Sequence, residues 1–103
     1  MHPLIEKKQA DIAALCQRYR VRHLEVFGSA ARGDDFDLNS SDADFLVEFE
    51  ARSDLPALEE FFGFQAALSR LLERSVDLVE ARAVRNPYVL AGINRTRKLV
   101  YAA

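Results

Sequence analysis

Two stretches of the chain repeat their hydrophobic residues with the period of an α-helix. In residues 4–20 apolar side chains recur every three or four positions, and Pro3 suits a first helical position. Residues 53–74 repeat the pattern behind capping residues. We expect the first stripe to bury Cys16 as a core thiol. We expect the second to pack its own stripe into the core: Leu58, Phe61, Phe62, Gln65, Leu68, Leu71 and Leu72.

Shorter segments between and after these helices alternate apolar and polar residues, as half-buried strands do. They cover residues 21–27, 43–49 and 76–80. A last helix is expected over 87–95, and 98–101 either adds a short edge strand or trails. The pattern predicts an α/β fold, a small mixed sheet with the two main helices on one face. The other face is then covered by something else or used for function.

Composition narrows the class of protein. The 103 residues are 50% hydrophobic, enough for the core of a single domain spanning 1–103. A net charge of −2 gives no basic field, so we expect no direct nucleic-acid binding. No apolar run reaches the roughly 18 residues of a membrane span. The single cysteine can form no internal disulfide, which fits a cytoplasmic location.

Asp42 and Asp44 stand two residues apart where the second expected strand begins. Residues at this spacing project from the same face of a strand, and like charges that close are unfavourable without a cation. Metal binding is one interpretation of the pair. A turn cap is the other, since an aspartate at a strand start often has that role.

Gly28 and Ser29 follow the first strand and offer a second kind of site. A glycine there lets backbone amides approach a phosphate, and a short helix starting at Ser29 would direct its positive end at the anion. Arg32, about one turn later, could reach the same anion. An ordinary strand-to-helix turn would explain Gly-Ser equally well.

Asp77 lies between apolar residues in the third short strand. Such a position is costly for a carboxylate unless it is paired or on an open face. If this strand neighbours the second, Asp77 can lie beside Asp42 and Asp44. Three carboxylates would suit Mg²⁺, and two such ions about 4 Å apart activate an attacking oxygen and stabilise a leaving one.

These features together resemble the DNA polymerase beta-type nucleotidyltransferase superfamily, and within it the minimal nucleotidyltransferases (MNT proteins). The segments that carry the resemblance are FGSAARG at 27–33, SDADFLVEF at 41–49 and VDLV at 76–79. The resemblance implies that Gly28 and Ser29 bind the triphosphate and that Arg32 contacts phosphate or acceptor. It implies that Asp42 and Asp44 hold the metals. It also implies that Asp77 completes the metal site and assists deprotonation of the attacking hydroxyl.

The resemblance also implies a reaction and a partner. A hydroxyl attacks the α-phosphate of a nucleoside triphosphate and releases pyrophosphate, with two Mg²⁺ ions as cofactors. MNT proteins are the antitoxin half of a module whose other half is a helical HEPN toxin, and some transfer AMP from ATP to a tyrosine of that partner. A hetero-oligomer of the two proteins is therefore expected. Two alternatives remain: a non-catalytic antitoxin that acts by complex formation, and nucleotidyl transfer to a small-molecule acceptor.

Two features depart from the family pattern. The loop 33–41 is slightly long and acidic, with Asp34, Asp35 and Asp37, and is either a contact for a basic partner or a solvated tip. Ser75 stands where a glycine-containing turn is common, which leaves the exit from the middle helix open.

Overall fold

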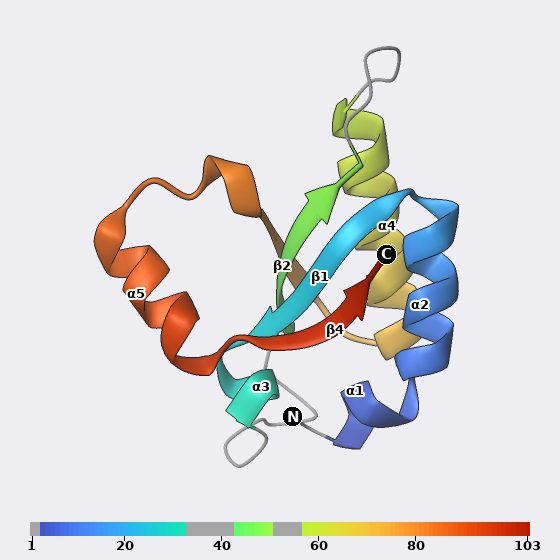
Figure 1. Cartoon of the computed structure of the whole chain (residues 1–103). Helices are drawn as coiled ribbons and strands as arrows, with labels where there is room; N and C mark the ends of the chain where they lie inside the picture. Colours follow the sequence, from blue (N-terminus) through green and yellow to red (C-terminus); the bar gives the residue numbers. More distant parts are fainter. Residues whose placement is uncertain (1–2, 33–42, 51–56) are drawn as a thin grey trace.

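A four-stranded mixed sheet forms the centre of the molecule (Figure 1). The computed structural model describes residues 3–32, 43–50 and 57–103. The strands are β1 (Val21–Phe27), β2 (Ala43–Phe49), β3 (Val76–Glu80) and β4 (Lys98–Ala102), in the spatial order β3-β2-β1-β4. β1 is antiparallel to β2 and β4, and β2 is parallel to β3. The predicted mixed sheet is confirmed, and of the two alternatives for the end of the chain the structure shows the edge strand.

The helices α2 (Gln9–Arg18) and α4 (Ala57–Leu72) pack against each other and against the same face of the sheet (Figure 1). The expected first helix is divided into α1 (Pro3–Lys7) and α2. The break is slight, because Lys8 N–H donates to the Leu4 carbonyl and Ile12 N–H to the Lys8 carbonyl, at 3.2 and 2.9 Å. Helical hydrogen bonding therefore continues across the boundary.

The hydrophobic core lies between this pair of helices and the sheet. Alternate residues of β2, namely Ala43, Phe45 and Val47, are fully buried on this face. Cys16 is also fully buried, as predicted, and burial raises the pKa of its thiol to about 12. It is therefore a core residue without thiolate chemistry at neutral pH.

Among the side chains that the structure describes, the expected apolar stripe of α4 is wrong at one position, while the side chain of Leu58 lies outside the description. Phe62 is 58% exposed, whereas Phe64, which the stripe omitted, is fully buried. Phe64, Leu68 and Leu72 recur every four residues and form the centre of the buried face, and this places Phe62 on the far side of the helix. The Phe64 ring packs against Tyr19 and Phe49, with centroids 5.8 and 6.1 Å apart.

Both main helices are followed by a charged residue in the left-handed region. Arg20 after α2 has φ +57°, and Glu73 after α4 has φ +55°. α4 ends two residues earlier than predicted, and Arg74 N–H then donates to the Ser69 carbonyl at 3.2 Å. Glu73 thus takes the place that a glycine commonly has in such a turn. Ser75, two residues later, leads into β3.

Three shorter elements complete the chain. α3 (Ser29–Arg32) follows β1 directly, as predicted, and η1 (Ala81–Ala83) follows β3. α5 (Pro87–Thr96) stands apart from α2 and α4 in Figure 1, and Asn86 caps it by accepting hydrogen bonds from Tyr88 N–H and Val89 N–H. Of its residues only Ile93 is buried.

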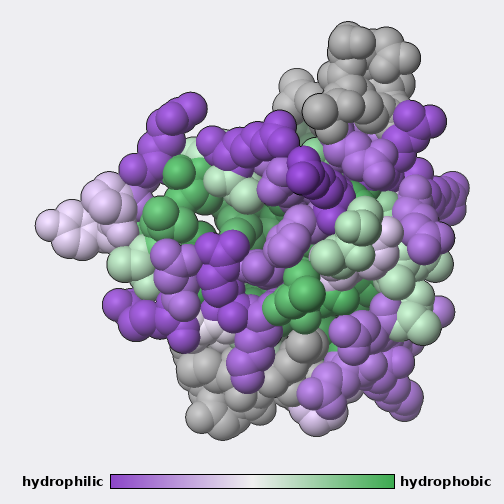
Figure 2. All heavy atoms as spheres, viewed as in Figure 1, coloured by the Kyte–Doolittle hydropathy of each residue, from purple (hydrophilic) through white to green (hydrophobic). Residues whose placement is uncertain are grey.

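The surface mixes charged and apolar side chains (Figure 2). Exposed apolar residues include Val89 and Leu90 of α5 and Leu99 of β4. Within the described part of the chain, no helix has the length and apolar character needed to cross a membrane.

Candidate functional site

Two of the predicted carboxylates lie side by side on neighbouring strands. Asp44 of β2 and Asp77 of β3 are partners in the parallel register, and parallel strands are about 4.8 Å apart. Their neighbours Ala43, Phe45, Val76 and Leu78 are buried on the helix-covered face. Both carboxylates therefore project from the opposite face, where Asp44 is half-buried and Asp77 exposed. The condition set by the sequence, that the third strand neighbour the second, is met.

The structure locates the other predicted site residues only in part. Asp42 precedes β2 and lies outside the described residues. Ser29 and Arg32 are the first and last residues of α3, so their backbone is placed directly after Gly28, while their side chains are outside the description. The geometry that can be examined is that of Gly28, Asp44 and Asp77.

Gly28 lies against the carboxylate of Asp44. It follows Phe27, which is the register partner of Asp44 across β1 and β2. Gly28 has φ +71°, and a Cβ atom built on it would be 2.8 Å from Asp44 Oδ2. Glycine is thus required by backbone conformation and by space, and its hydrogen leaves room beside an acidic oxygen.

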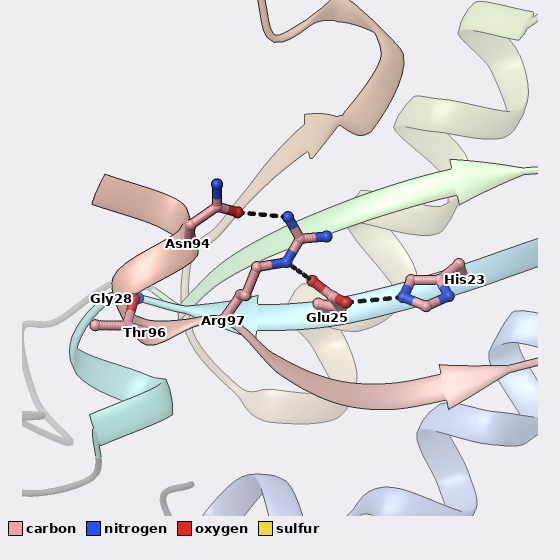
Figure 3. Close-up of polar contacts among 6 residues, drawn as sticks. All are labelled: His23, Glu25, Gly28, Asn94, Thr96 and Arg97. Carbon is pink, nitrogen blue, oxygen red and sulfur yellow. Dashed lines mark hydrogen bonds and ion pairs between the residues drawn. The ribbon is translucent and has the colours of Figure 1, made fainter. Parts of the chain in front are cut away.

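The backbone of Gly28 is held by a residue that sequence reasoning missed. Gly28 N–H donates to Thr96 Oγ1, at the last position of α5, over 2.9 Å (Figure 3). This N–H is therefore occupied, so Gly28 could serve an anion only by permitting close approach and not by donating this N–H. The expected helix stopped at residue 95, and no local pattern links a threonine to a turn 68 residues earlier.

Next to Thr96, Arg97 ties the start of β4 to β1 (Figure 3). Arg97 Nε pairs with Glu25, and Arg97 Nη1 donates to Asn94 Oδ1 at 2.7 Å. His23 Nε2 lies 2.9 Å from the other Glu25 oxygen, so His23 has a structural role. Burial favours a raised pKa for the Glu25 carboxyl, but the bonds to Arg97 and His23 outweigh it and the pKa is lowered.

The donor set fits a hard divalent cation. Carboxylate oxygens are the ligands that Mg²⁺ prefers, and Asp44 and Asp77 present them from adjacent strands beside the space left by Gly28. Among residues 3–32, 43–50 and 57–103 there is no cluster of three acidic, histidine or cysteine side chains that could hold a metal. The third predicted carboxylate, Asp42, is outside these ranges.

Comparison with known proteins defines the family. Residues 12–100 match the nucleotidyltransferase domain family, so the chain belongs to it. "Protein adenylyltransferase MntA" of Thermococcus cleftensis is 37% identical over 89 residues, 84% of this chain and 80% of the relative. "Putative protein adenylyltransferase MJ0128" of Methanocaldococcus jannaschii is 39% identical over 79 residues, 77% and 76% of the two chains. The chain is thus an enzyme of the nucleotidyltransferase class.

Solved structures narrow the class to the minimal nucleotidyltransferases. A structure described as a "putative minimal nucleotidyltransferase" superposes with a TM-score of 0.72 and 30% identity, covering 95% of each chain. Another match is a chain in a structure described as the tri-AMPylated HEPN toxin of Shewanella oneidensis in complex with MNT antitoxin. It superposes with a TM-score of 0.66 and 17% identity, over 96% of this chain and 73% of that chain. The second likeness shows the fold alone. The predicted resemblance to the MNT proteins is confirmed.

Proposed function

We propose that this chain transfers AMP from ATP to a hydroxyl group of a HEPN-type toxin, with tyrosine as the acceptor, and so acts as its antitoxin. The observation that carries the proposal is the pairing of Asp44 and Asp77 across β2 and β3, directly beside Gly28. An acidic pair next to a turn that admits close approach suits a metal-assisted reaction on a phosphate.

Each predicted site residue has a role in this proposal. Asp42, Asp44 and Asp77 would hold two Mg²⁺ ions. When bound, Mg²⁺ supplies neutralisation of the triphosphate charge and activation of the attacking oxygen. Gly28 and Ser29 would receive the triphosphate, and the Arg32 guanidinium would contact phosphate or acceptor.

The reaction requires one bond to form and one to break. The acceptor oxygen bonds to the α-phosphorus of ATP, the bond from that phosphorus to the bridging oxygen breaks, and pyrophosphate leaves. The acceptor proton passes to the Asp77 carboxylate, whose exposed position on the open face suits contact with an incoming group. Positioning and charge neutralisation account for most of such catalysis, so a small scaffold suffices.

The proposal of a HEPN-type partner is supported by the names of similar proteins and by the description of a protein of the same fold. Relatives at 37% and 39% identity are named as protein adenylyltransferases, and a protein of the same fold is described in complex with an AMPylated HEPN toxin. A protein acceptor would supply the hydroxyl and the rest of the binding surface in a hetero-oligomer. Because ATP is an intracellular substrate, the reaction belongs in the cytoplasm.

The test is transfer of labelled AMP from ATP to a HEPN-type partner protein, with Mg²⁺ and after chelation. Wild type should label the partner, chelation should abolish labelling, and Asp44→Asn with Asp77→Asn should lower the rate by more than about 100-fold. Asp11→Asn, an exposed aspartate of α2, is the matched control and should change nothing.

Three outcomes would contradict parts of the proposal. Full transfer by the double variant would show that the carboxylate assignment is wrong. A double variant that labels nothing but still protects cells from the toxin would favour neutralisation by complex formation. Efficient AMP transfer to small hydroxylated acceptors, with none to the partner, would show that the acceptor class is wrong.

A further inference from the structure

We infer that Thr96 is a positioning residue for the nucleotide-binding turn. It would act by fixing the Gly28 peptide, without touching the nucleotide itself. The inference rests on the proposed function in one respect, the role of Gly28 in receiving the triphosphate. It adds a residue from α5, on the far side of the turn from the strands that carry the acidic pair.

Gly28 is held from two sides. Its carbonyl accepts a hydrogen bond from Ala31 N–H of α3 at 3.1 Å, and its N–H donates to Thr96 Oγ1 at 2.9 Å. The residue has no Cβ to restrict its conformation, and it occupies the left-handed region. Without the Thr96 oxygen, a part-buried N–H would lose its partner and the peptide would gain freedom to rotate.

The precision of this contact matters because of what lies beside it. Asp44 Oδ2 is only 2.8 Å from the point where a Cβ of residue 28 would stand. Rotation of the Gly28 peptide therefore changes the space next to a carboxylate of the acidic pair. By holding the Gly28 N–H, Thr96 thus fixes both the conformation of the turn at Gly28 and the space between that turn and the Asp44 carboxylate.

Thr96 is itself held firmly. Arg97 N–H donates to the Ile93 carbonyl at 2.8 Å, which closes the end of α5. The Arg97 side chain is anchored on Glu25, whose side chain is 12% exposed, and Lys98 pairs with Val26 where β4 begins. The hydroxyl is therefore presented from the junction of a helix and a strand, both attached to β1 just before Gly28 (Figure 3).

Two substitutions at Thr96 separate the hydroxyl from the shape of the side chain. Thr96→Val keeps the branched shape and removes the acceptor, whereas Thr96→Ser keeps the acceptor. Asn86→Ala removes the cap at the opposite end of α5 and loosens the same helix without altering the Gly28 contact. It is the matched control for a purely structural effect.

Two measurements are made on each variant. Amide hydrogen exchange at Gly28 reports the hydrogen bond, and titration with ATP and Mg²⁺ reports nucleotide affinity. Thr96→Val should lose Gly28 protection and raise both the ATP Kd and its KM about three- to tenfold, with kcat changed less, as loss of uniform binding predicts. Thr96→Ser should restore both readouts, and Asn86→Ala should leave the ATP Kd unchanged.

The outcomes separate this inference from the proposed function. Wild type that binds ATP, with Thr96→Val binding it equally well, would overturn the positioning role alone. A rise in Kd in Asn86→Ala as large as that in Thr96→Val would also overturn it, since general loosening of α5 would then be the cause. If the wild type binds no ATP, the proposed function is overturned, and the positioning role falls with it. This holds even if amide exchange shows that Thr96 protects the Gly28 N–H.

Discussion

At the scale of single residues, Gly28 satisfies two demands that any other side chain would violate. Its φ of +71° is in the region that L-residues avoid, and its missing Cβ makes room for the Asp44 carboxylate. The sequence showed that a glycine stands after a strand. It could not show that the glycine faces this aspartate, because the contact depends on the register between β1 and β2.

Gly28→Ala should therefore damage the site more than the fold. The left-handed conformation costs about 1–2 kcal/mol for alanine, and the new Cβ must displace Asp44 Oδ2. We expect ATP affinity to fall by more than about tenfold. Gly92→Ala is the control, because a Cβ there meets only Arg95 Nη2 at 3.7 Å and should leave affinity unchanged. Equal affinities in both variants would refute the prediction.

Glu25 makes stability depend on pH. Because its pKa in the folded state is below the ordinary value of 4.5, its contribution is fully present above that pH and is lost as the pH falls through the folded pKa. At pH 7, Glu25→Gln should lower the free energy of unfolding by about 1 kcal/mol, allowing for the exposure of Arg97. Urea unfolding at pH 7 and pH 3 should show this difference shrinking in acid. A difference that is the same at both pH values would be contrary evidence.

At the scale of elements, strands were predictable and helix ends were not. β1, β2 and β3 have the predicted bounds because alternation of apolar and polar residues ends where each strand ends. α4 ends earlier than its pattern suggested, since Glu73 turns the backbone into the left-handed region without the glycine that would have announced it.

Glu73, the charged residue after α4, has a strained left-handed backbone conformation that substitution by glycine can relieve. Glu73→Gly should raise the free energy of unfolding by about 0.5–1 kcal/mol, since glycine adopts φ +55° without a steric cost. The melting temperature should rise by about 2–8 °C. Glu73→Ala removes the same carboxylate but keeps a Cβ and should not stabilise. Stabilisation by alanine alone would point to charge instead of backbone conformation.

At the scale of the whole molecule, one face of the sheet holds the core and the other holds the acidic pair. The sequence predicted that the two main helices cover one face and left open whether the other face is covered or used for function. It also predicted that Asp77 would lie beside Asp44 if β2 and β3 were neighbours. It did not predict Thr96, because the β4 segment and the end of α5 reach the site only through long-range pairing with β1. The sequence pattern also assigned Phe62 to the core in place of Phe64. Both phenylalanines lie close to the helical stripe, and the pattern alone does not show which of them is buried.

Phe64 and Phe62 offer a matched test of where the core lies. Phe64→Ala should lower the free energy of unfolding by about 3–5 kcal/mol, a large part of the 5–15 kcal/mol typical of a domain. Phe62→Ala, from a side chain that is 58% exposed, should cost less than about 1 kcal/mol. Chemical denaturation measures both. Similar losses in the two variants would show that the helix is rotated from the orientation described.

The hydrogen bond between Gly28 and Thr96 also sets an order of events during synthesis. The two residues are 68 positions apart, and a ribosome adding about 5–20 residues per second needs roughly 3–14 s to reach Thr96 after Gly28. The strands that carry Asp44 and Asp77 are synthesised within that interval, while the turn at Gly28 still lacks the hydroxyl that fixes it. A chain still under synthesis therefore has both aspartates before it has Thr96, and we expect the turn at Gly28 to be fixed only at a late stage of folding.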